Sequence, residues 1–423
     1  MEALSAITLL IEKSKEWGGP LWVVKTDIHK AFDKLYLQGI IEAMQARGVP
    51  PVLVLGFARE LTGTTLSLYL DGVLSLPVLQ QRGSGQGRPD SPTLFTAALD
   101  EIVGPLSQSW ARRGFGFQLR RANGSKRLVN HICFVDDILL VALSRQQAET
   151  MLRELDEGLR ARGLQLSPGK CVYSCNEAAD AADRRGLRFR GAELERCEAL
   201  PFLGTLLDLN ASTNMEFEAR LRKGWGAFWN LKDLLLRRSA NLPNRIRLLN
   251  VTVFKGILWG SQCWKLTEGQ EAHLRSVQNH MVRKMMRLGR GPEEQWIPFY
   301  RRTLRAAHEA VQRALGGHDL VFQLRHLRWG WAGHLARLDE GRLAKQVANY
   351  RSLEWWRDRQ EEIRADRLRY DPRRRPGPGR PALKWEEQLE VFAASYGATW
   401  TQLAADRLVW ASLQDVYARG PSA

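Results

Sequence analysis

Apolar residues near the start of the chain change from helical spacing to strand-like spacing. They recur every three or four positions through residues 1–17, which predicts a helix, and a Gly-Gly-Pro run ends it. Residues 21–28 are rich in β-branched and aromatic side chains, which predicts a strand. Asp27 is therefore expected at the end of a strand, directly before a helical stretch that begins near His29.

Two later stretches predict hairpins. Residues 66–82 contain an Asp-Gly pair at 71–72, and both residue types tolerate the positive φ of a short hairpin loop. Residues 128–143 form two apolar runs on either side of Asp136 and Asp137. This pattern predicts a second hairpin that carries both carboxylates at its tip.

Loops and helices separate and follow these hairpins. A glycine-rich loop spans residues 83–87, and Ser91, followed by proline, is a typical first residue of a helix. Residues 146–162 predict another helix, whereas the charged, alanine-rich residues 176–199 predict a surface connection. From residue 209 onward helical patterns predominate, so the sequence indicates an α+β part followed by a helical part.

The helical part has its own signals. Thr267 and Gln270 are spaced as a capping box, which predicts a helix start. After residue 320 arginine and tryptophan become dense together, and this interleaving predicts a surface that binds RNA or DNA. Residues 373–381, RRRPGPGRP, are incompatible with a helix and predict an extended basic linker.

Composition narrows the class of protein. The formal net charge of +16 attracts polyanions, so nucleic acid is the expected partner, although a merely basic globular protein would show the same charge. The five cysteines match neither a disulfide framework nor a zinc motif, and we expect them to be reduced, packed and intracellular. No apolar run reaches the roughly 18 residues of a membrane span, and no secretion signal begins the chain. Membrane partners are therefore not expected.

Three aspartates carry the predicted chemistry. A sheet that pairs the strand ending at Asp27 with the hairpin of Asp136 and Asp137 would bring all three carboxylates together. Such a cluster is repulsive until cations bind it, and its hard oxygen ligands suit Mg²⁺. Two ions would activate a primer hydroxyl and stabilise the leaving pyrophosphate, with Mn²⁺ as an alternative ion. Read alone, however, adjacent aspartates at a turn are more often plain turn residues.

A resemblance to a known family rests on five segments in order. The segments are residues 25–33 (KTDIHKAFD), 82–95 (RGSGQGRPDSPTLF), 134–137 (FVDD), 163–170 (GLQLSPGK) and 202–204 (FLG). Together they resemble the motifs of reverse transcriptases of LINE-type, non-LTR retrotransposons. Any one of these motifs would be weak evidence, but five in family order are specific. Arg88, Asp90, Val135 and Ser167 depart from the commoner residues, and none of these departures removes an expected metal ligand.

The resemblance implies catalytic roles for five residues. Asp27, Asp136 and Asp137 would hold two Mg²⁺ ions, assisted by the backbone carbonyl of Ile28. Lys170 matches the family's candidate proton donor to pyrophosphate. A dinucleotide-binding reading of the glycine-rich loop lacks a third glycine and an acidic residue for the ribose.

The resemblance also implies binding roles. Phe32 matches an aromatic steric gate that leaves no room for a 2′-hydroxyl and so favours deoxynucleotides, although the ring could equally be part of the core. Gln86 and Gly87 match residues that contact the incoming nucleotide and the template base. The primer grip matches Phe202, Leu203 and Gly204. The predicted contacts with the nucleic-acid backbone are Lys223, Arg283, Lys284 and Arg287.

The implied fold is a polymerase right-hand palm, an antiparallel sheet with packed helices, followed by an all-α thumb and a basic helical C-terminal region. Its predicted boundaries are 1–208 for partial fingers and palm, 209–290 for the thumb, and 291–423 for a basic, Trp-rich region with a linker near 371–381. The upstream fingers strands of the family, which bring basic residues to the triphosphate, are not expected in this chain. The resemblance therefore implies an N-terminally truncated enzyme.

The expected function is RNA-directed DNA synthesis from an RNA template, a DNA primer and deoxynucleoside triphosphates, in an intracellular and nuclear setting. Two alternatives remain open. One is a domesticated or inactive fragment that only binds nucleic acid, and the other is an RNA-dependent RNA polymerase or a maturase, which shares the palm chemistry. Neither the template nor the oligomeric state follows from the sequence.

Overall fold

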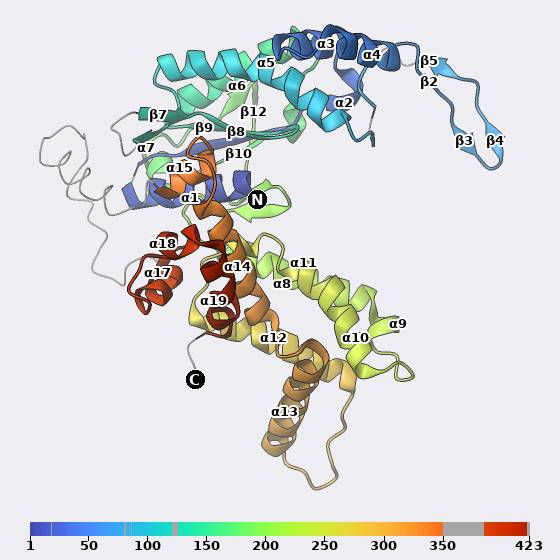
Figure 1. The fold of residues 1–423 in the computed structure, drawn as a ribbon, viewed down its shortest axis with the longest axis vertical. Coiled ribbons are helices and arrows are strands. Elements are labelled where there is room, and N and C mark those ends of the chain that lie inside the picture. Colours follow the sequence, from blue (N-terminus) through green and yellow to red (C-terminus); the bar gives the residue numbers. More distant parts are fainter. Residues whose placement is uncertain (18, 80–81, 86, 121–125, 350–384, 421–423) are drawn as a thin grey trace, which may run out of the picture. The chain divides into compact units, whose positions relative to one another are not determined.

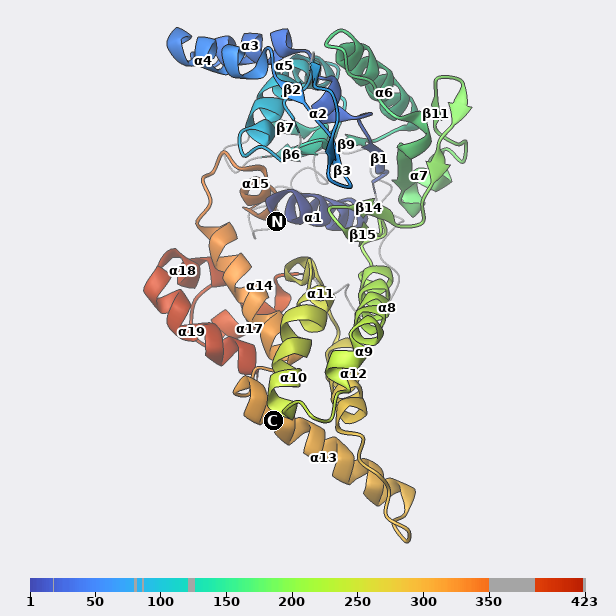
Figure 2. The ribbon, with the colours of Figure 1, turned by 90° about the vertical axis from the view of Figure 1, so that its right-hand side faces the viewer.

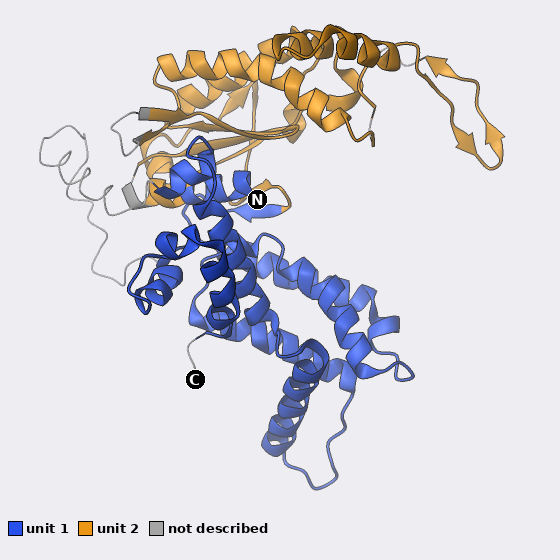
Figure 3. Cartoon of the chain, viewed as in Figure 1, with its two compact units in different colours: residues 1–9, 205–423 blue, residues 10–204 orange. Residues whose placement is uncertain are grey.

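The computed structural model describes residues 1–17, 19–79, 82–85, 87–120, 126–349 and 385–420. The chain divides into two compact units, which Figure 3 shows in different colours. One unit comprises residues 10–204, and the other comprises residues 1–9 together with 205–423. The predicted helix at the N-terminus is present as α1 (Glu2–Trp17), and its residues belong partly to each unit.

A five-stranded sheet forms the centre of the unit of residues 10–204, in the order β13-β10-β1-β9-β8. All neighbouring strands run antiparallel except β10 and β13, which run parallel. The predicted strand before Asp27 is β1, and the predicted second hairpin is β8–β9. The strands are β1 (Trp22–Thr26), β8 (His131–Phe134), β9 (Asp137–Ala142), β10 (Val172–Cys175) and β13 (Glu195–Arg196).

Helices pack on this sheet through their apolar faces (Figure 1). The predicted helix at Ser91 is present, and α6 begins where the Ser144 side chain accepts a hydrogen bond from the Gln147 amide. The buried faces of α5 and α6 share one core with the inner strands β1 and β9. The helices are α2 (Ala31–Lys34), α3 (Leu37–Ala46), α4 (Pro51–Leu61), α5 (Ser91–Arg112) and α6 (Arg145–Arg160).

An exposed hairpin arm follows α4. The predicted turn is confirmed, because Asp71 has φ 49° and Gly72 has φ 84°, the two positive values of a tight hairpin loop. Nearly every apolar side chain of the arm is exposed to solvent, including Tyr69 at 73%. Its strands are β2 (Thr65–Leu66), β3 (Tyr69–Leu70), β4 (Val73–Leu74) and β5 (Val78–Leu79), and a separate small hairpin consists of β6 (Phe117–Arg120) and β7 (Lys126–Val129).

The prediction of a plain surface connection at 176–199 was wrong. This stretch contains ordered elements, and its last strand, β13, joins the central sheet beside β10. Leu187, Phe189 and Leu194 are buried in the palm core. Strands of two residues are too short to show alternation, and the surrounding charges conceal the three buried positions. The elements before β13 are α7 (Glu177–Ala182), β11 (Arg188–Phe189) and β12 (Ala192–Glu193).

The other unit is helical, as predicted; β15 (Thr205–Leu207) is the strand among its described residues. The predicted capping box of Thr267 and Gln270 is formed at the start of α12. The principal helices, seen from two directions in Figures 1 and 2, are α8 (Asn214–Asn230), α9 (Lys232–Leu235), α10 (Leu242–Leu249), α11 (Lys255–Ile257), α12 (Glu268–Met286), α13 (Trp296–Leu315), α14 (Leu320–Ala336), α15 (Leu343–Asn349), α17 (Glu387–Ala394), α18 (Trp400–Ala405) and α19 (Arg407–Arg419).

Four tryptophans in the region that the sequence assigned to nucleic-acid binding are buried in a core, namely Trp329, Trp385, Trp400 and Trp410. Trp329 stacks on Trp410 with ring centroids 3.6 Å apart, and each indole N–H donates to the other residue's backbone carbonyl. Gly333 leaves room for this packing, because a Cβ there would collide with the Trp410 ring. The predicted linker near 371–381 lies outside the described residues.

Candidate active site

Strand register brings the first aspartate beside the hairpin tip. In the β1–β9 ladder Thr26 pairs with Ile138. Asp27 directly follows Thr26, and Asp137 directly precedes Ile138, so the two aspartates occupy facing positions at the end of an antiparallel pair. The sequence alone could not give this register, because it depends on which strands pair.

Asp136 lies at the tip of the β8–β9 hairpin, next to a residue with an unusual backbone conformation. Val135 has φ 57°, a left-handed value that a β-branched residue rarely adopts and that is often found at functional sites. Partial burial raises the pKa of Asp136, and the negative charges of Asp137 and Asp27 add to this rise. A hydrogen bond from its own backbone and the charge of Lys25 oppose it. The three carboxylates therefore influence one another electrostatically, as a cluster would.

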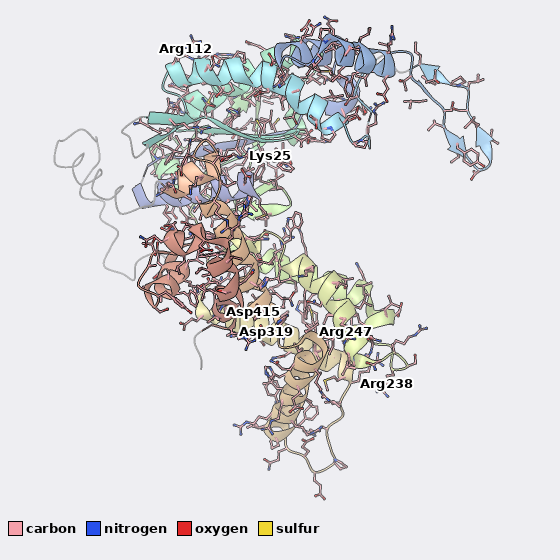
Figure 4. All side chains as sticks on the ribbon, viewed as in Figure 1. Lys25, Arg112, Arg238, Arg247, Asp319 and Asp415 are labelled. Carbon is pink, nitrogen blue, oxygen red and sulfur yellow. The ribbon has the colours of Figure 1, made fainter. Side chains whose placement is uncertain are left out.

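Two lysines contact this acidic group. Lys25 Nζ lies 3.4 Å from Asp137 Oδ1, and Lys170 Nζ lies 3.6 Å from Asp27 Oδ2. Lys170 was predicted at this site, but Lys25, labelled in Figure 4, was not. The available signal was strand alternation, since residues two apart on β1 share a face and Lys25 precedes Asp27 by two. Each ammonium group provides positive charge where a cation would bind.

The stretch that carries Lys170 is tied to the backbone around Asp27. The Ser167 amide donates to the Asp27 carbonyl at 2.8 Å, and the His29 amide donates to the Gln165 carbonyl at 2.9 Å. Ile28, whose carbonyl was predicted to assist metal binding, forms an isolated antiparallel bridge with Leu166. These bonds fix residues 163–170 next to the end of β1.

Phe32 and the glycine-rich loop are in direct contact. Phe32 lies on the short helix α2, half-buried, with its ring centroid 4.9 Å from that of Phe95 on α5. The Ser84 amide donates to the Phe32 carbonyl at 3.0 Å. Gly83 has φ 84°, and a Cβ at this position would collide with the Phe32 backbone, so glycine is required here. The predicted nucleotide-binding segments thus adjoin each other.

The loop is also fixed to the start of α5. The Ser91 hydroxyl lies 2.7 Å from the carbonyl oxygens of both Ser84 and Gly85. Gly87, a predicted nucleotide contact, has φ 87°. The other predicted contact, Gln86, lies outside the described residues.

Arg88 and Asp90, two residues that depart from the family motif, bind each other through their side chains. Arg88 donates to both carboxylate oxygens of Asp90 at 3.1 Å and also approaches Glu60 at 3.1 Å. The Arg88 guanidinium lowers the pKa of Asp90, so this carboxylate stays charged. The pair therefore connects the loop to α4, an arrangement that sequence reasoning missed because Glu60 is distant along the chain.

The predicted primer grip is a tight turn. Phe202 ends β14 (Leu200–Phe202), a strand that packs beside β1 and β10, and its side chain is fully buried. Leu203 has φ 46° and Gly204 has φ 77°. The backbone of this turn is thus more available to a primer than the Phe202 ring is.

The predicted phosphate-contacting residues lie in the helical unit and differ in their surroundings. Lys223 is exposed on α8, and Arg287 ends α12 in a left-handed conformation. Arg283 lies over the Tyr300 ring, with 4.5 Å between Cζ and the ring centroid. Lys284 Nζ lies 5.5 Å from the Trp229 ring centroid. Trp229 and Trp259 are exposed.

The donor set of the acidic cluster fits a hard divalent cation. It consists of carboxylate oxygens that solvent can reach, and partial burial, followed by the charges of Asp137 and Asp27, raises the pKa of Asp136. Across the described part of the chain, no three acidic, histidine or cysteine side chains already stand in a metal-binding arrangement. The residues thus match a metal site in their chemistry, with the two lysine ammonium groups beside the carboxylates.

An antiparallel sheet with aspartates at a strand end and at a neighbouring hairpin tip, beside a glycine-rich loop, defines the palm of a nucleic-acid polymerase. Residues 3–207 match the family described as reverse transcriptase (RNA-dependent DNA polymerase). The matched stretch includes Asp27, the glycine-rich loop and the hairpin of Asp136 and Asp137, so the site lies within residues that are similar to reverse transcriptases.

Similar proteins come from transposable elements. The chain is 23% identical over 298 residues to a transposon-derived protein of Caenorhabditis elegans, covering 69% of this chain and 96% of that protein. It is 28% identical over 166 residues to the Pol polyprotein of the retrotransposable element R2DM of Drosophila melanogaster, and 25% identical over 178 residues to the R2 polyprotein of Nasonia vitripennis. These matches cover 39% and 40% of this chain but only 15% and 16% of the two polyproteins.

Among solved structures, apo telomerase from Candida tropicalis is similar, with a TM-score of 0.37, 12% identity, and coverage of 82% of this chain and 55% of that chain. A TM-score of this size does not establish a common fold. Among the helices whose residues are described, none combines the length and the apolar character that crossing a bilayer requires.

Proposed function

We propose that this chain catalyses RNA-templated DNA synthesis. The oxygen of a primer 3′-hydroxyl forms a bond to the α-phosphorus of a deoxynucleoside triphosphate, and the bond to the bridging oxygen breaks. The products are an extended primer, pyrophosphate and the hydroxyl proton. The observation that supports this function best is the acidic group of Asp27, Asp136 and Asp137, which lies within residues that are similar to reverse transcriptases, beside a glycine-rich loop.

Asp27, Asp136 and Asp137, with the carbonyl of Ile28, would hold two Mg²⁺ ions, or Mn²⁺ in their place. When bound, the ions lower the pKa of the attacking hydroxyl and neutralise charge on the leaving pyrophosphate. The protein itself contributes position: the β1–β9 register and the hairpin tip fix where the carboxylates stand. The charges of Lys25 and Lys170 would reduce the repulsion between the carboxylates. Lys170 would also protonate the pyrophosphate.

Phe32 would select the sugar. Its ring packs against Phe95 and its backbone carbonyl accepts a hydrogen bond from the Ser84 amide, so the ring would not move aside easily when a 2′-hydroxyl approaches. Gln86 and Gly87 would contact the nucleotide and template base, and the turn at Phe202, Leu203 and Gly204 would hold the primer end. This assignment supports deoxynucleotides as the substrate.

The remaining assignments follow from the helical unit. Residues 209–290 would be the thumb that holds the RNA template and DNA primer, with Lys223, Arg283, Lys284 and Arg287 near phosphates. Residues 291–423 would extend this grip. We propose that the reaction takes place in the nucleus, where chromosomal DNA can supply the primer.

Primer extension on an RNA template tests this function. We expect Asp136→Asn to reduce deoxynucleotide incorporation by about 10³-fold, because it removes a charged metal ligand while keeping the side-chain shape. Asp71→Asn is the matched control: it changes an aspartate at another hairpin turn, where asparagine also tolerates positive φ, and should extend primers like the unsubstituted chain. Equal extension by Asp136→Asn would contradict the proposal.

A second function is favoured by the lysine contacts at the carboxylates. If Lys25 and Lys170 permanently take the place of metal ions, the chain would bind nucleic acid without polymerising. Salt-sensitive RNA binding together with no extension in either Mg²⁺ or Mn²⁺ would favour this function.

A further inference from the structure

The first turns of α13 carry exposed rings beside exposed arginines. Trp296 is 61% exposed, Ile297 is 62% exposed and Tyr300 is 40% exposed. Figures 1 and 2 both show this end of α13, with the loop from α12, projecting beyond the neighbouring helices. The exposed arginines on the same turns are Arg301, Arg302 and Arg305.

These rings extend the apolar face of α13 beyond the part that packs against other helices. Trp296 and Tyr300 lie on the same face as Thr303, Ala307 and Val311, because these residues follow at helical spacing. The last three are buried in the unit, where α10 and α12 pack against α13. The face therefore continues into solvent without a covering helix at its N-terminal end.

The rings and arginines are already organised. Arg283 Cζ lies 4.5 Å from the Tyr300 ring centroid, and the Trp296 and Phe299 rings are 5.7 Å apart. Arg302 donates two hydrogen bonds to Glu294, at 2.8 and 2.7 Å, and this pair lowers the pKa of Glu294 to about 2. The negative charge of Glu294, two residues before Trp296, is thus paired with Arg302.

We propose that this surface, the α13 platform of Trp296, Tyr300, Arg283, Arg301 and Arg305, binds single-stranded nucleic acid. Unpaired bases offer flat faces that stack on exposed rings, and flanking guanidinium groups attract the phosphates. Bases within a duplex are already stacked on each other and cannot use the rings. The proposal deepens the proposed function and rests on the grip assigned there to residues 291–423, but strand binding requires no catalysis and α13 lies outside the matched residues 3–207.

Charge favours nucleic acid over a second copy of this chain. A symmetric contact between two copies through this face would bring the same arginines together, and like charges repel. The hairpin arm provides the contrast. Tyr69 is 73% exposed there, and the stretch from residue 61 to residue 79 contains no lysine or arginine.

Fluorescence anisotropy with labelled 20-nucleotide RNA and DNA strands tests the platform in the full chain. We expect Trp296→Ala/Tyr300→Ala to weaken single-strand binding by at least about tenfold, while a duplex of the same sequence binds as before. Trp296→Phe/Tyr300→Phe keeps two flat rings and should restore most of the affinity. Tyr69→Ala removes an exposed ring from a surface without lysine or arginine and should leave strand binding unchanged.

Salt titration tests the arginines separately. Removing two phosphate contacts with Arg301→Gln/Arg305→Gln should reduce the salt slope for single strands by about 1.4.

If Trp296→Ala/Tyr300→Ala fails to fold, ultraviolet cross-linking of a bromouridine strand to the unsubstituted chain replaces it. Adducts on the peptide that carries Trp296 and Tyr300 would support the platform, and adducts confined to other peptides would overturn it.

Three results would overturn the proposal. One is unchanged single-strand affinity in Trp296→Ala/Tyr300→Ala, and another is an equal loss for duplex. The third is a wild-type dimer that this variant dissociates with no change in strand binding, which would make the face a self-interface. Asp136→Asn should bind strands normally, so an inactive polymerase would leave this test unaffected.

Discussion

The two compact units differ in charge and in the chemistry that they offer. Residues 10–204 contain 25 lysines and arginines and 22 aspartates and glutamates, so their charges nearly balance. Residues 205–423 contain 37 lysines and arginines but only 23 aspartates and glutamates, so this part of the chain is strongly basic. The first unit places three carboxylates at one end of a sheet, and the second places arginines around exposed rings. The proposed functions assign phosphoryl transfer to the first unit and nucleic-acid binding to the second, so we expect substitutions to change the two separately.

The helical unit contains buried and exposed tryptophans, and alanine substitution should lower the unfolding free energy much more at a buried one. Trp329→Ala removes a ring that is stacked and doubly hydrogen-bonded in a closed core, so we expect the unit to lose about 3–5 kcal/mol of unfolding free energy. Trp296→Ala, its matched control, removes an exposed ring and should cost under about 0.5 kcal/mol. Denaturant unfolding measures both.

The same pair of substitutions can contradict this distinction. Similar losses of stability in Trp329→Ala and Trp296→Ala would show that the exposed end of α13 is covered by other parts of the protein. The α13 platform would then not be available to a nucleic-acid strand.

A substitution in the unit of residues 10–204 should have a smaller effect, on the choice between deoxynucleotides and ribonucleotides. Phe32→Val opens space beneath the sugar, and we expect the preference for deoxynucleotides over ribonucleotides to fall roughly tenfold to a hundredfold. The ratio of kcat/KM for the two nucleotides measures it. Phe95→Leu removes a support of the Phe32 ring but keeps the ring itself, so it should lower the ratio less than Phe32→Val does. An unchanged ratio in Phe32→Val would show that the ring is only part of the core.

Sequence reasoning predicted those features that depend on a few neighbouring residues. The Asp71-Gly72 turn, the helix start at Ser91 and the capping box at Thr267 and Gln270 depend on local backbone preferences, and the structure contains all three. The positions of Asp27 at a strand end and of Asp136 at a hairpin tip followed from the same kind of signal.

Features that depend on tertiary packing were not predictable in this way. Lys25 reaches Asp137 only because β1 pairs with β9, and Arg88 reaches Glu60 only because the loop folds back on α4. Burial of Trp329 and exposure of Trp229 are opposite outcomes for one residue type on helices of the same unit. Which neighbours cover a helix face is decided by the whole unit, and composition cannot show it.

Metal-directed cleavage tests the central claim most directly. Fe²⁺ can replace Mg²⁺ at oxygen ligands, and with ascorbate and peroxide it cuts the backbone close to where it binds. The account predicts cuts near both residue 27 and residues 136–137, suppressed by excess Mg²⁺ and absent in Asp136→Asn. Cuts at only one of these segments, or cuts that persist in Asp136→Asn, would contradict a shared metal site and with it the proposed polymerase.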